Sequence, residues 1–230
     1  MADPVAAVLF DLDDTLVRYR RSPETLLRES FDAVGVDPVF PVEAYYDRFD
    51  EFAERTHSMR ELREECFAAL CAERDRDPDL GREVASAYAD ARDHRDVEFL
   101  PGARDVLDAF AAEYRLGIVT NGARDPQAQK IDAVGLDSVV DVVVFAGHDA
   151  PPKPAPEPFR HALDALEAGP EAAVHVGNSL DSDVAGAAAA GIRSVWLAGG
   201  DAADGAASAE RADHVVESLA ELSRRPWLEK

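Results

Sequence analysis

Two aspartates stand directly behind the first apolar segment of the chain. The segment runs from Val5 to Phe10, and Asp11 and Asp13 follow it. A short, continuous apolar run is typical of a strand buried on both faces of a parallel sheet. Residues two apart in extended chain point to the same side, so the carboxylates share the end of this strand. Such a pair favours a hard cation such as Mg²⁺ with oxygen ligands, although an acidic turn that caps a helix has the same composition.

Polar residues also follow three later segments that are predicted to be strands. They are Thr120 with Asn121 after the second strand, Lys153 within Pro-Lys-Pro after the third, and Gly177-Asn178-Ser179 through Asp183 after the fourth. In an open α/β sheet the carboxyl ends of the strands meet in one crevice. We therefore expect these side chains to converge with Asp11 and Asp13 on a single site.

The elements that must position these residues alternate between strand and helix from Leu100 onwards. Strands are predicted at 116–120, 140–146, 173–176, 194–197 and 214–216, and helices at 103–112, 126–134, 156–167 and 181–190, with a last helix near the C-terminus. This alternation predicts right-handed crossovers and a parallel sheet. The Gly/Ala/Asp-rich stretch 199–209 is predicted to be a loop.

A different pattern occupies the region between the first strand and Leu100. Apolar residues recur there at helical spacing, with breaks near 35–38, 56–58 and 76–78, and no strand signal appears between about 18 and 97. The sequence therefore predicts about four helices inserted into an α/β fold. The expected boundaries are 1–16 and 98–230 for the α/β core and 17–97 for the all-α insertion.

The charge and hydropathy of the chain exclude several classes of function. The 230 residues include 46 acidic and 24 basic ones, which gives a formal net charge of −22. A surface this acidic repels nucleic acid and anionic membranes. No apolar run reaches the ~20 residues of a membrane span, and no signal peptide is evident, so a cytoplasmic protein is expected. Cys66 and Cys71 have neither a metal-binding nor a disulfide-framework spacing.

Lysine is scarce in this chain. Only Lys130, Lys153 and Lys230 occur, and arginine supplies the other 21 basic residues. An acidic excess with little lysine is typical of proteins adapted to high salt, where screening makes self-repulsion tolerable. The alternative is an arginine-biased, alanine-rich coding composition.

In their order and placement the four motifs resemble those of the haloacid dehalogenase-like hydrolase superfamily, of the type with a helical cap after the first strand. The resemblance rests on Asp11-Leu12-Asp13-Asp14-Thr15-Leu16, Thr120-Asn121-Gly122, Lys153 between prolines, and Gly177-Asn178-Ser179 through Asp183. It implies a three-layer, doubly wound, Rossmann-type parallel-sheet core with an all-α cap. It also implies a Mg²⁺-dependent phosphatase that acts through an aspartyl-phosphate.

The resemblance assigns a role to each motif residue. Asp11 would be the nucleophile, and Asp13 the general acid that later becomes the base. Mg²⁺ would be held by Asp11 and the backbone carbonyl of Asp13, with oxygens of the fourth motif, Asn178 and Asp183. Catalytic and phosphate-binding contacts would come from Thr120 and Lys153, with donors around Asn121 and Gly122.

Two positions depart from the family pattern. Asp14 stands where glycine is frequent, and Asn178 stands where an aspartate is usual. A neutral amide oxygen in place of a carboxylate should weaken Mg²⁺ binding unless Asp183, or with less reason Asp181, compensates. Asp13 itself favours phosphoryl chemistry, because the dehalogenases of the superfamily lack an acid at that position.

We interpret the sequence as that of a phosphohydrolase for a small phosphomonoester. Phosphoglycolate, a nucleoside monophosphate and a sugar phosphate are all compatible with the sequence, as are a monomer and a homodimer. A phosphomutase on the same scaffold and a non-catalytic phosphate-binding regulatory protein are the alternatives. The roles of His148, and of Arg55, His57 and Arg60 in the cap, stay open at this stage.

The acidic composition generates a first prediction. Folding and activity should improve in molar KCl, because salt screens the repulsion among the excess carboxylates. Thermal unfolding and turnover measured from dilute buffer to molar KCl test this. Full activity in dilute buffer that disappears at high salt would contradict it.

Overall fold

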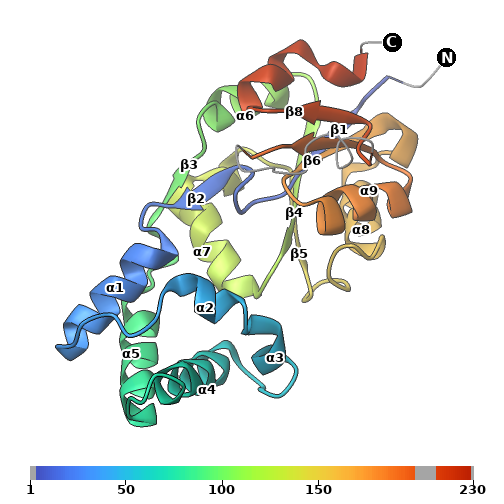
Figure 1. The fold of residues 1–230 in the computed structure, drawn as a ribbon. Coiled ribbons are helices and arrows are strands. Elements are labelled where there is room, and N and C mark those ends of the chain that lie inside the picture. Colours follow the sequence, from blue (N-terminus) through green and yellow to red (C-terminus); the bar gives the residue numbers. More distant parts are fainter. Residues whose placement is uncertain (1–3, 200–210, 229–230) are drawn as a thin grey trace. The chain divides into compact units, whose positions relative to one another are not determined.

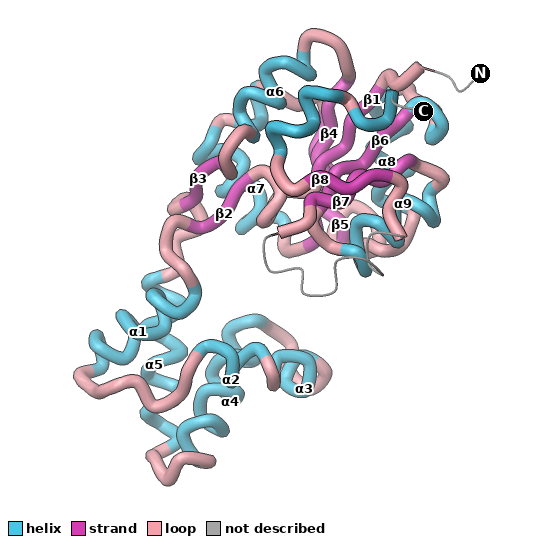
Figure 2. Tube along the Cα trace, turned by 45° about the horizontal axis from the view of Figure 1, so that its top comes forward, coloured by secondary structure: helices cyan, strands magenta, loops and turns pink. Residues whose placement is uncertain are grey.

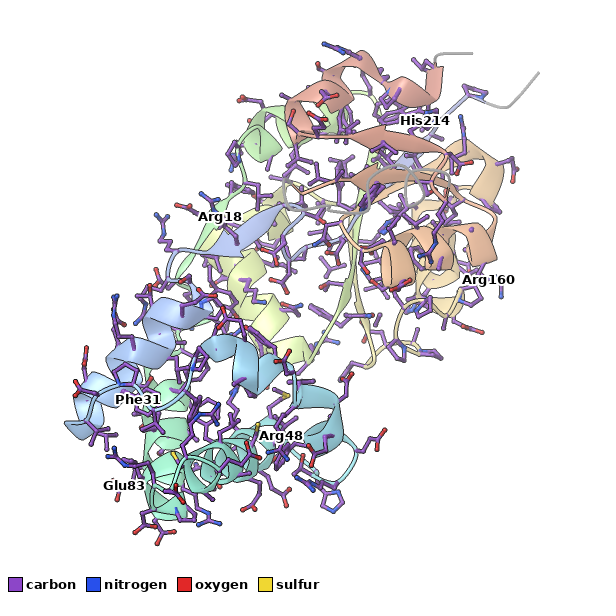
Figure 3. The ribbon with its side chains drawn as sticks, viewed as in Figure 1. Arg18, Phe31, Arg48, Glu83, Arg160 and His214 are labelled. Atoms are coloured by element: carbon purple, nitrogen blue, oxygen red, sulfur yellow. The ribbon has the colours of Figure 1, made fainter. Side chains whose placement is uncertain are left out.

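The chain folds into two compact units. The computed structural model describes residues 4–199 and 211–228, and its contacts separate an α/β unit, Met1–Tyr19 with His94–Lys230, from a helical unit, Arg20–Asp93. The α/β unit also keeps two short strands, β2 (Val17–Tyr19) and β3 (Val97–Phe99), which pair antiparallel. These strands were not predicted from the sequence, because three residues are too few to show an alternating pattern. Their outer faces are joined by Arg18, labelled in Figure 3, and Glu98 at 2.9 Å.

A six-stranded sheet forms the centre of the α/β unit (Figures 1 and 2). Its order is β5-β4-β1-β6-β7-β8 and all its pairings are parallel. The strands are β1 (Ala7–Phe10), β4 (Arg115–Asn121), β5 (Val142–Ala146), β6 (Ala173–Gly177), β7 (Arg193–Leu197) and β8 (His214–Val216). All four residues of β1 are fully buried between β4 and β6. The apolar run therefore became an interior strand, as the sequence predicted.

Helices cover both faces of this sheet. Val8 and Phe10 of β1 pack with the core that includes α6 and α7, whereas Ala7 and Leu9 pack with the core that includes α8 and α9. The four helices are α6 (Ala103–Ala111), α7 (Arg124–Val134), α8 (Glu157–Leu166) and α9 (Ala185–Ala190). The predicted three-layer, doubly wound α/β fold is thus confirmed.

Two predicted helices have a different form. The segment expected as a helix at 181–190 begins with a π-helical turn, Leu180–Val184, before α9. The predicted last helix consists of two 3₁₀ segments, Leu219–Arg224 and Pro226–Leu228, because Pro226 offers no N–H to continue a helix. Shorter 3₁₀ turns lie at Leu136–Ser138 and Pro170–Ala172. The predicted loop 199–209 lies outside the described residues from position 200 onwards.

The helical unit contains five helices, whereas about four were predicted. They are α1 (Pro23–Val34), α2 (Val42–Tyr46), α3 (Phe49–Ala53), α4 (Met59–Ala72) and α5 (Pro78–Ala91). Phe31, labelled in Figure 3, lies in a core of aromatic rings that meet edge to face. Gly81 lets α5 approach α4 closely, because a Cβ there would lie 2.3 Å from the Phe67 carbonyl oxygen. Cys66 and Cys71 are buried free thiols. No helix in the described ranges is long and apolar enough to cross a membrane.

Candidate active site

Asp11 lies where the central strand ends. Its backbone N–H donates to the Val176 carbonyl at 2.9 Å, which continues the pairing of β1 with β6 for one more residue. Its Oδ1 accepts a 2.7 Å hydrogen bond from Lys153 Nζ, and its Oδ2 lies 3.4 Å from the Thr15 hydroxyl. The Asp11 side chain is only 10% exposed. One oxygen of this buried carboxylate thus accepts from a lysine, and its other oxygen lies near a neutral hydroxyl.

Lys153 joins two carboxylates. Its Nζ donates to Asp11 Oδ1, to Asp183 Oδ1 at 2.6 Å and to the Val119 carbonyl at 2.8 Å, so all three N–H bonds are used. Burial disfavours the ammonium, but the two carboxylates outweigh it and raise the pKa of Lys153. A phosphoryl oxygen could bind this ammonium only in exchange for one of the three protein oxygens. Charge compensation is the role that this geometry supports.

Asp183 is buried in the protein. Its Oδ1 also accepts from His175 Nε2 at 3.0 Å, and its Oδ2 accepts from the Ser179 backbone N–H at 3.0 Å. Burial opposes its charge, but the His175 hydrogen bond and the Lys153 ammonium lower the pKa of Asp183 below its usual range. Gly177 makes room for it, since a Cβ there would lie 2.3 Å from Asp183 Cγ. Both oxygens are therefore engaged within the protein, which differs from the metal-ligand role expected from the sequence.

The sharing of one ammonium leaves Asp11 short of positive charge. Burial, together with the nearby charge of Asp183, raises the pKa of Asp11 to about 7 despite its contact with Lys153. Asp183 has further donors and Asp11 has few. A carboxylate in this position is suited to bind an exchangeable cation in addition to the lysine.

Asp13 lies beside Asp11 with a separate set of partners from helix α7. Lys130 Nζ donates to Asp13 Oδ1 at 2.7 Å and to Oδ2 at 2.8 Å, and Gln127 Nε2 donates to Oδ2 at 2.9 Å. The Lys130 side chain is 6% exposed, whereas the Asp13 side chain is 37% exposed. Asp11 and Asp13 therefore each contact a different buried lysine.

Thr120, Asn121 and Gly122 hold other side chains in place. The Thr120 hydroxyl accepts from Gln127 Nε2 at 2.9 Å. The Asn121 side chain accepts from the Lys153 backbone N–H at 2.8 Å and donates to its carbonyl at 3.1 Å, so it fixes the lysine-bearing loop. A Cβ on Gly122, whose φ is +128°, would lie 3.0 Å from Gln127 Nε2. The Asn121 amide is thus used for positioning and not free to bind phosphate.

The fourth motif brings a neutral oxygen to Asp11. Asn178 Oδ1 lies 3.4 Å from the Thr15 hydroxyl, which lies equally far from Asp11 Oδ2. The Asn178 carbonyl accepts from the Trp196 indole at 2.9 Å, which anchors this residue. Asp181 is 90% exposed and pairs with Arg211 at 3.0 Å. Of the two acids that could compensate for Asn178, neither presents a free oxygen beside Asp11.

The oxygens near Asp11 fit Mg²⁺ if water completes the set of ligands. Within the described residues, no group of three or more His, Cys, Asp or Glu side chains could hold a metal. The donor set would therefore be the Asp11 carboxylate, the Asn178 amide oxygen and the Asp13 backbone carbonyl, completed by water. All are the hard oxygen donors that Mg²⁺ prefers, and the ion keeps several waters in most protein sites. The unmet charge of Asp11 supports this assignment.

The structure explains the unusual Asp14. Its φ is +56°, in the left-handed region that glycine adopts without strain and that aspartate tolerates better than most residues. Burial, then the neighbouring Asp13 charge, raises the pKa of Asp14. The chain therefore keeps the backbone turn of the motif, although residue 14 is an aspartate and not a glycine.

Three site residues were not singled out from the sequence: Lys130, Gln127 and His175. Lys130 carried a usable signal, since it is, like Lys153, one of only three lysines in the sequence. Gln127 and Lys130 are also three apart on a helix that follows Thr120-Asn121-Gly122, a spacing that places them on one face. His175 sits inside an apolar strand, and only the structure brings it to Asp183.

The residues whose roles stayed open lie in local charge pairs. His148 is exposed and its Nδ1 lies 2.9 Å from Asp149, while Asp149 also accepts from the Phe145 backbone. In the helical unit, Arg55 pairs with Glu51 at 3.1 Å and Arg60 with Glu64 at 2.8 Å. His57 follows the end of α3 and its backbone N–H donates to Glu61. Arg55 and His57 thus lie in the polar segment between α3 and α4, and Arg60 lies in the first turn of α4.

Comparisons with known proteins agree with this geometry. A family model described as haloacid dehalogenase-like hydrolase matches residues 5–191. The chain is 31% identical to phosphoserine phosphatase of Thermus thermophilus, over 83% of this chain and 87% of that protein. It is 29% identical to glyceraldehyde 3-phosphate phosphatase of Pyrococcus furiosus, over 95% and 91% respectively. A magnesium-bound HAD-type hydrolase from Bacillus subtilis shares the fold, with TM-score 0.73, 20% identity, and coverage of 97% and 99%.

The raised pKa of Asp11 predicts a pH dependence of stability in the presence of a chelator. The carboxyl titrates near its ordinary value of 3.8 in the unfolded chain and near 7 in the folded one. Between these values the folded state binds more protons, so this group lowers the free energy of unfolding as the pH rises. The stability of Asp11→Asn relative to wild type should therefore increase from about pH 4 to 7 and level off above. Urea denaturation with EDTA measures this, and Asp108→Asn on exposed α6 is the control. A difference that does not change with pH would contradict the prediction.

Proposed function

The chain belongs to the haloacid dehalogenase-like hydrolase family, and we propose that it is a Mg²⁺-dependent phosphatase acting on small phosphomonoesters through an aspartyl-phosphate on Asp11. The observation that carries the proposal is the buried Asp11 carboxylate, whose Oδ1 is bound by Lys153 and whose Oδ2 has no charged donor among the described residues. Asp13 lies beside it on the same strand end and is more exposed. Two relatives, from Thermus and Pyrococcus, bear phosphatase names.

In the first half-reaction, Asp11 attacks the phosphorus atom. Its Oδ2 is the oxygen available for attack, since Oδ1 is bound to Lys153. The phosphorus–oxygen bond to the leaving group breaks, and the protonated Asp13 gives its proton to the departing oxygen. The products are the alcohol and an acyl phosphate on Asp11. Lys153 offsets the negative charge that gathers around Asp11.

In the second half-reaction, water releases the phosphoryl group. The Asp13 carboxylate takes a proton from water, and the resulting hydroxide attacks phosphorus while its bond to Asp11 breaks. Inorganic phosphate leaves, Asp11 returns to the carboxylate and Asp13 is again protonated. One residue thus serves as acid and then as base, which a partly exposed carboxylate beside the nucleophile can do.

Magnesium would stabilise the negative charge of the phosphoryl oxygens and bring them close to Asp11. Asp11, Asn178 and the Asp13 backbone carbonyl are the residues that we assign to the ion. Asp183 is assigned to positioning Lys153, because its two oxygens are occupied by Lys153, His175 and Ser179.

The remaining assignments follow from the same proposal. The helical unit, Arg20–Asp93, is assigned as the cap and the α/β unit, Met1–Tyr19 with His94–Lys230, as the catalytic core, so the cap begins and ends a few residues inside the 17–97 expected from the sequence. The acidic surface is proposed as an adaptation to high salt. The cytoplasmic location and the monomeric or homodimeric state stay predictions. The alternatives to a phosphatase are a phosphomutase and a phosphate-binding regulatory protein, and the assay below distinguishes among the three.

Phosphate release from a panel of esters tests the proposal. We expect turnover with Mg²⁺ and none with EDTA, on a panel that includes phosphoserine, glyceraldehyde 3-phosphate, phosphoglycolate, nucleoside monophosphates and sugar phosphates. Asp11→Asn should remove turnover, because an amide oxygen is a poor nucleophile and forms no acyl phosphate. The control is Asp108→Asn, the same chemical change on the exposed face of α6, which should keep full activity.

The alternatives give different results in the same assay. Turnover that requires a sugar bisphosphate would indicate a mutase. Binding of phosphate or vanadate without any turnover would indicate a regulatory protein. Activity that survives Asp11→Asn would overturn the assignment of the nucleophile.

The neutral ligand Asn178 generates a separate prediction. Asn178→Asp adds a carboxylate to the ion's donor set, so the Mg²⁺ concentration for half-maximal activity should fall about tenfold, since ligand charge sets the affinity of such sites. Magnesium titration of activity and isothermal calorimetry measure it. The exposed Asp181→Asn, which removes a charge two residues from Ser179, should leave the Mg²⁺ requirement unchanged. An unchanged or weaker affinity in Asn178→Asp would contradict the assignment of this residue as a ligand.

A further inference from the structure

Lys130 directs its ammonium group at one residue of the site. Its Nζ lies 2.7 and 2.8 Å from the two Asp13 oxygens and 4.8 Å from the centre of the Tyr19 ring. The side chain is 6% exposed, so this charge is held inside the protein. Burying an ammonium is costly unless it is paired with good geometry. Both lysines in the described part of the chain are buried here, while arginines form its surface ion pairs.

Gln127 fixes the same carboxylate from a second direction. Its Nε2 lies 2.9 Å from Asp13 Oδ2, 2.9 Å from the Thr120 hydroxyl and 2.8 Å from the Asn121 carbonyl. The side chain is buried, and Gly122 leaves the space that it needs. One amide therefore ties Asp13 to the end of β4, where Thr120 and Asn121 lie.

These contacts restrain the orientation of Asp13. Lys130 reaches both oxygens and Gln127 reaches one, so the plane of the carboxylate is fixed by three N–H bonds. All of these donors belong to helix α7, and 37% of the Asp13 side chain is exposed. A lysine suits this place because its ammonium is compact, whereas the planar guanidinium of arginine is larger and needs a forked partner.

We propose that Lys130 and Gln127 are positioning residues that orient Asp13 for both of its proton transfers. The proposal rests on the proposed phosphatase function, because it concerns the acid and base of that reaction. In the first half-reaction Asp13 must present its proton to the leaving oxygen, and in the second it must face the attacking water. Proton transfer requires hydrogen-bond distance, so a carboxylate that rotates freely does both steps poorly.

Substrates with different leaving groups distinguish this positioning role from a merely structural one. An alkoxide needs a proton as it departs, whereas p-nitrophenolate leaves without one. Loss of the oriented acid should therefore lower kcat/KM on an alkyl phosphate far more than on p-nitrophenyl phosphate, because kcat/KM reports the first half-reaction. General-acid catalysis contributes roughly 10²–10⁴-fold. A variant that only loses stability or folded fraction lowers both values equally.

The second half-reaction gives an independent readout. With p-nitrophenyl phosphate the first step stays fast, and a badly oriented base slows hydrolysis of the acyl phosphate. A rapid burst of p-nitrophenolate, close to one per active site, should then precede a slow steady state. The burst amplitude also counts the folded, competent enzyme.

The experiment compares five variants in the full chain with Mg²⁺. Asp13→Asn shows how far the alkyl-to-nitrophenyl ratio of kcat/KM falls when the proposed general acid is removed. Lys130→Met and Gln127→Leu should show the same selectivity, with the alkyl-to-nitrophenyl ratio of kcat/KM reduced at least about tenfold for Lys130→Met. Arg104→Met removes one positive charge from an exposed i,i+4 pair with Asp108 and should leave the ratio unchanged. Propylammonium should restore part of the ratio in Lys130→Ala, and guanidinium should restore less.

The outcomes distinguish this inference from the function on which it rests. A selective loss in Asp13→Asn with an equal loss on both substrates in Lys130→Met and Gln127→Leu would overturn the positioning role and leave the phosphatase standing. An Asp13→Asn variant without selectivity would instead overturn Asp13 as the general acid. If Lys130→Met does not fold, Gln127→Leu carries the test, since it removes a neutral partner and no charge.

Discussion

One buried ammonium group, that of Lys153, holds the centre of this site together. It satisfies Asp11, Asp183 and the Val119 carbonyl at once, and so joins the ends of β1 and β4 to the turn after β6. Two carboxylates this close would repel each other in a poorly solvated interior without a cation between them. Asp183 accepts two further hydrogen bonds at 3.0 Å, from His175 and Ser179, whereas Oδ2 of Asp11 has the neutral Thr15 hydroxyl at 3.4 Å, so the imbalance of charge falls on Asp11. The nucleophile proposed here is therefore the group left in need of a cation.

The surroundings of Lys153 are organised to keep it in place. The Asn121 amide binds both backbone polar groups of the lysine, and Gly177 gives Asp183 the space of a missing Cβ. A second ammonium, Lys130, stands in the same relation to Asp13 from helix α7. The site thus contains two aspartate–lysine pairs of different exposure, the buried pair Asp11–Lys153 and the more exposed pair Asp13–Lys130. In the reaction proposed above, the first pair would serve bond formation and the second proton transfer, which agrees with the greater exposure of Asp13.

The contrast between interior and surface extends to the choice of basic residue. Arginine forms exposed pairs such as Arg18–Glu98 and Arg60–Glu64, which are individually worth little in stability. Lysine is used where a compact charge must fit among buried oxygens, as at Lys153 and Lys130. The rarity of lysine in the composition is thus informative about the site as well as about the surface.

The layered α/β fold, the helical insertion and the convergence of four motifs could be predicted from the sequence alone, because buried strands, helix periodicity and strand-end residues are local signals. The same signals led to Asp11, Asp13, Thr120 and Lys153 as candidates. Which partner each side chain takes depends on the tertiary fold. Asp183 turns inward to Lys153 and His175, Asn121 holds a loop 32 residues away, and Lys130 reaches Asp13 from a helix 117 residues later. The strands β2 and β3 and the π-helical turn were decided in the same way. Such pairings depend on distances across the sheet and on the unequal burial of like charges, which neither spacing nor composition encodes.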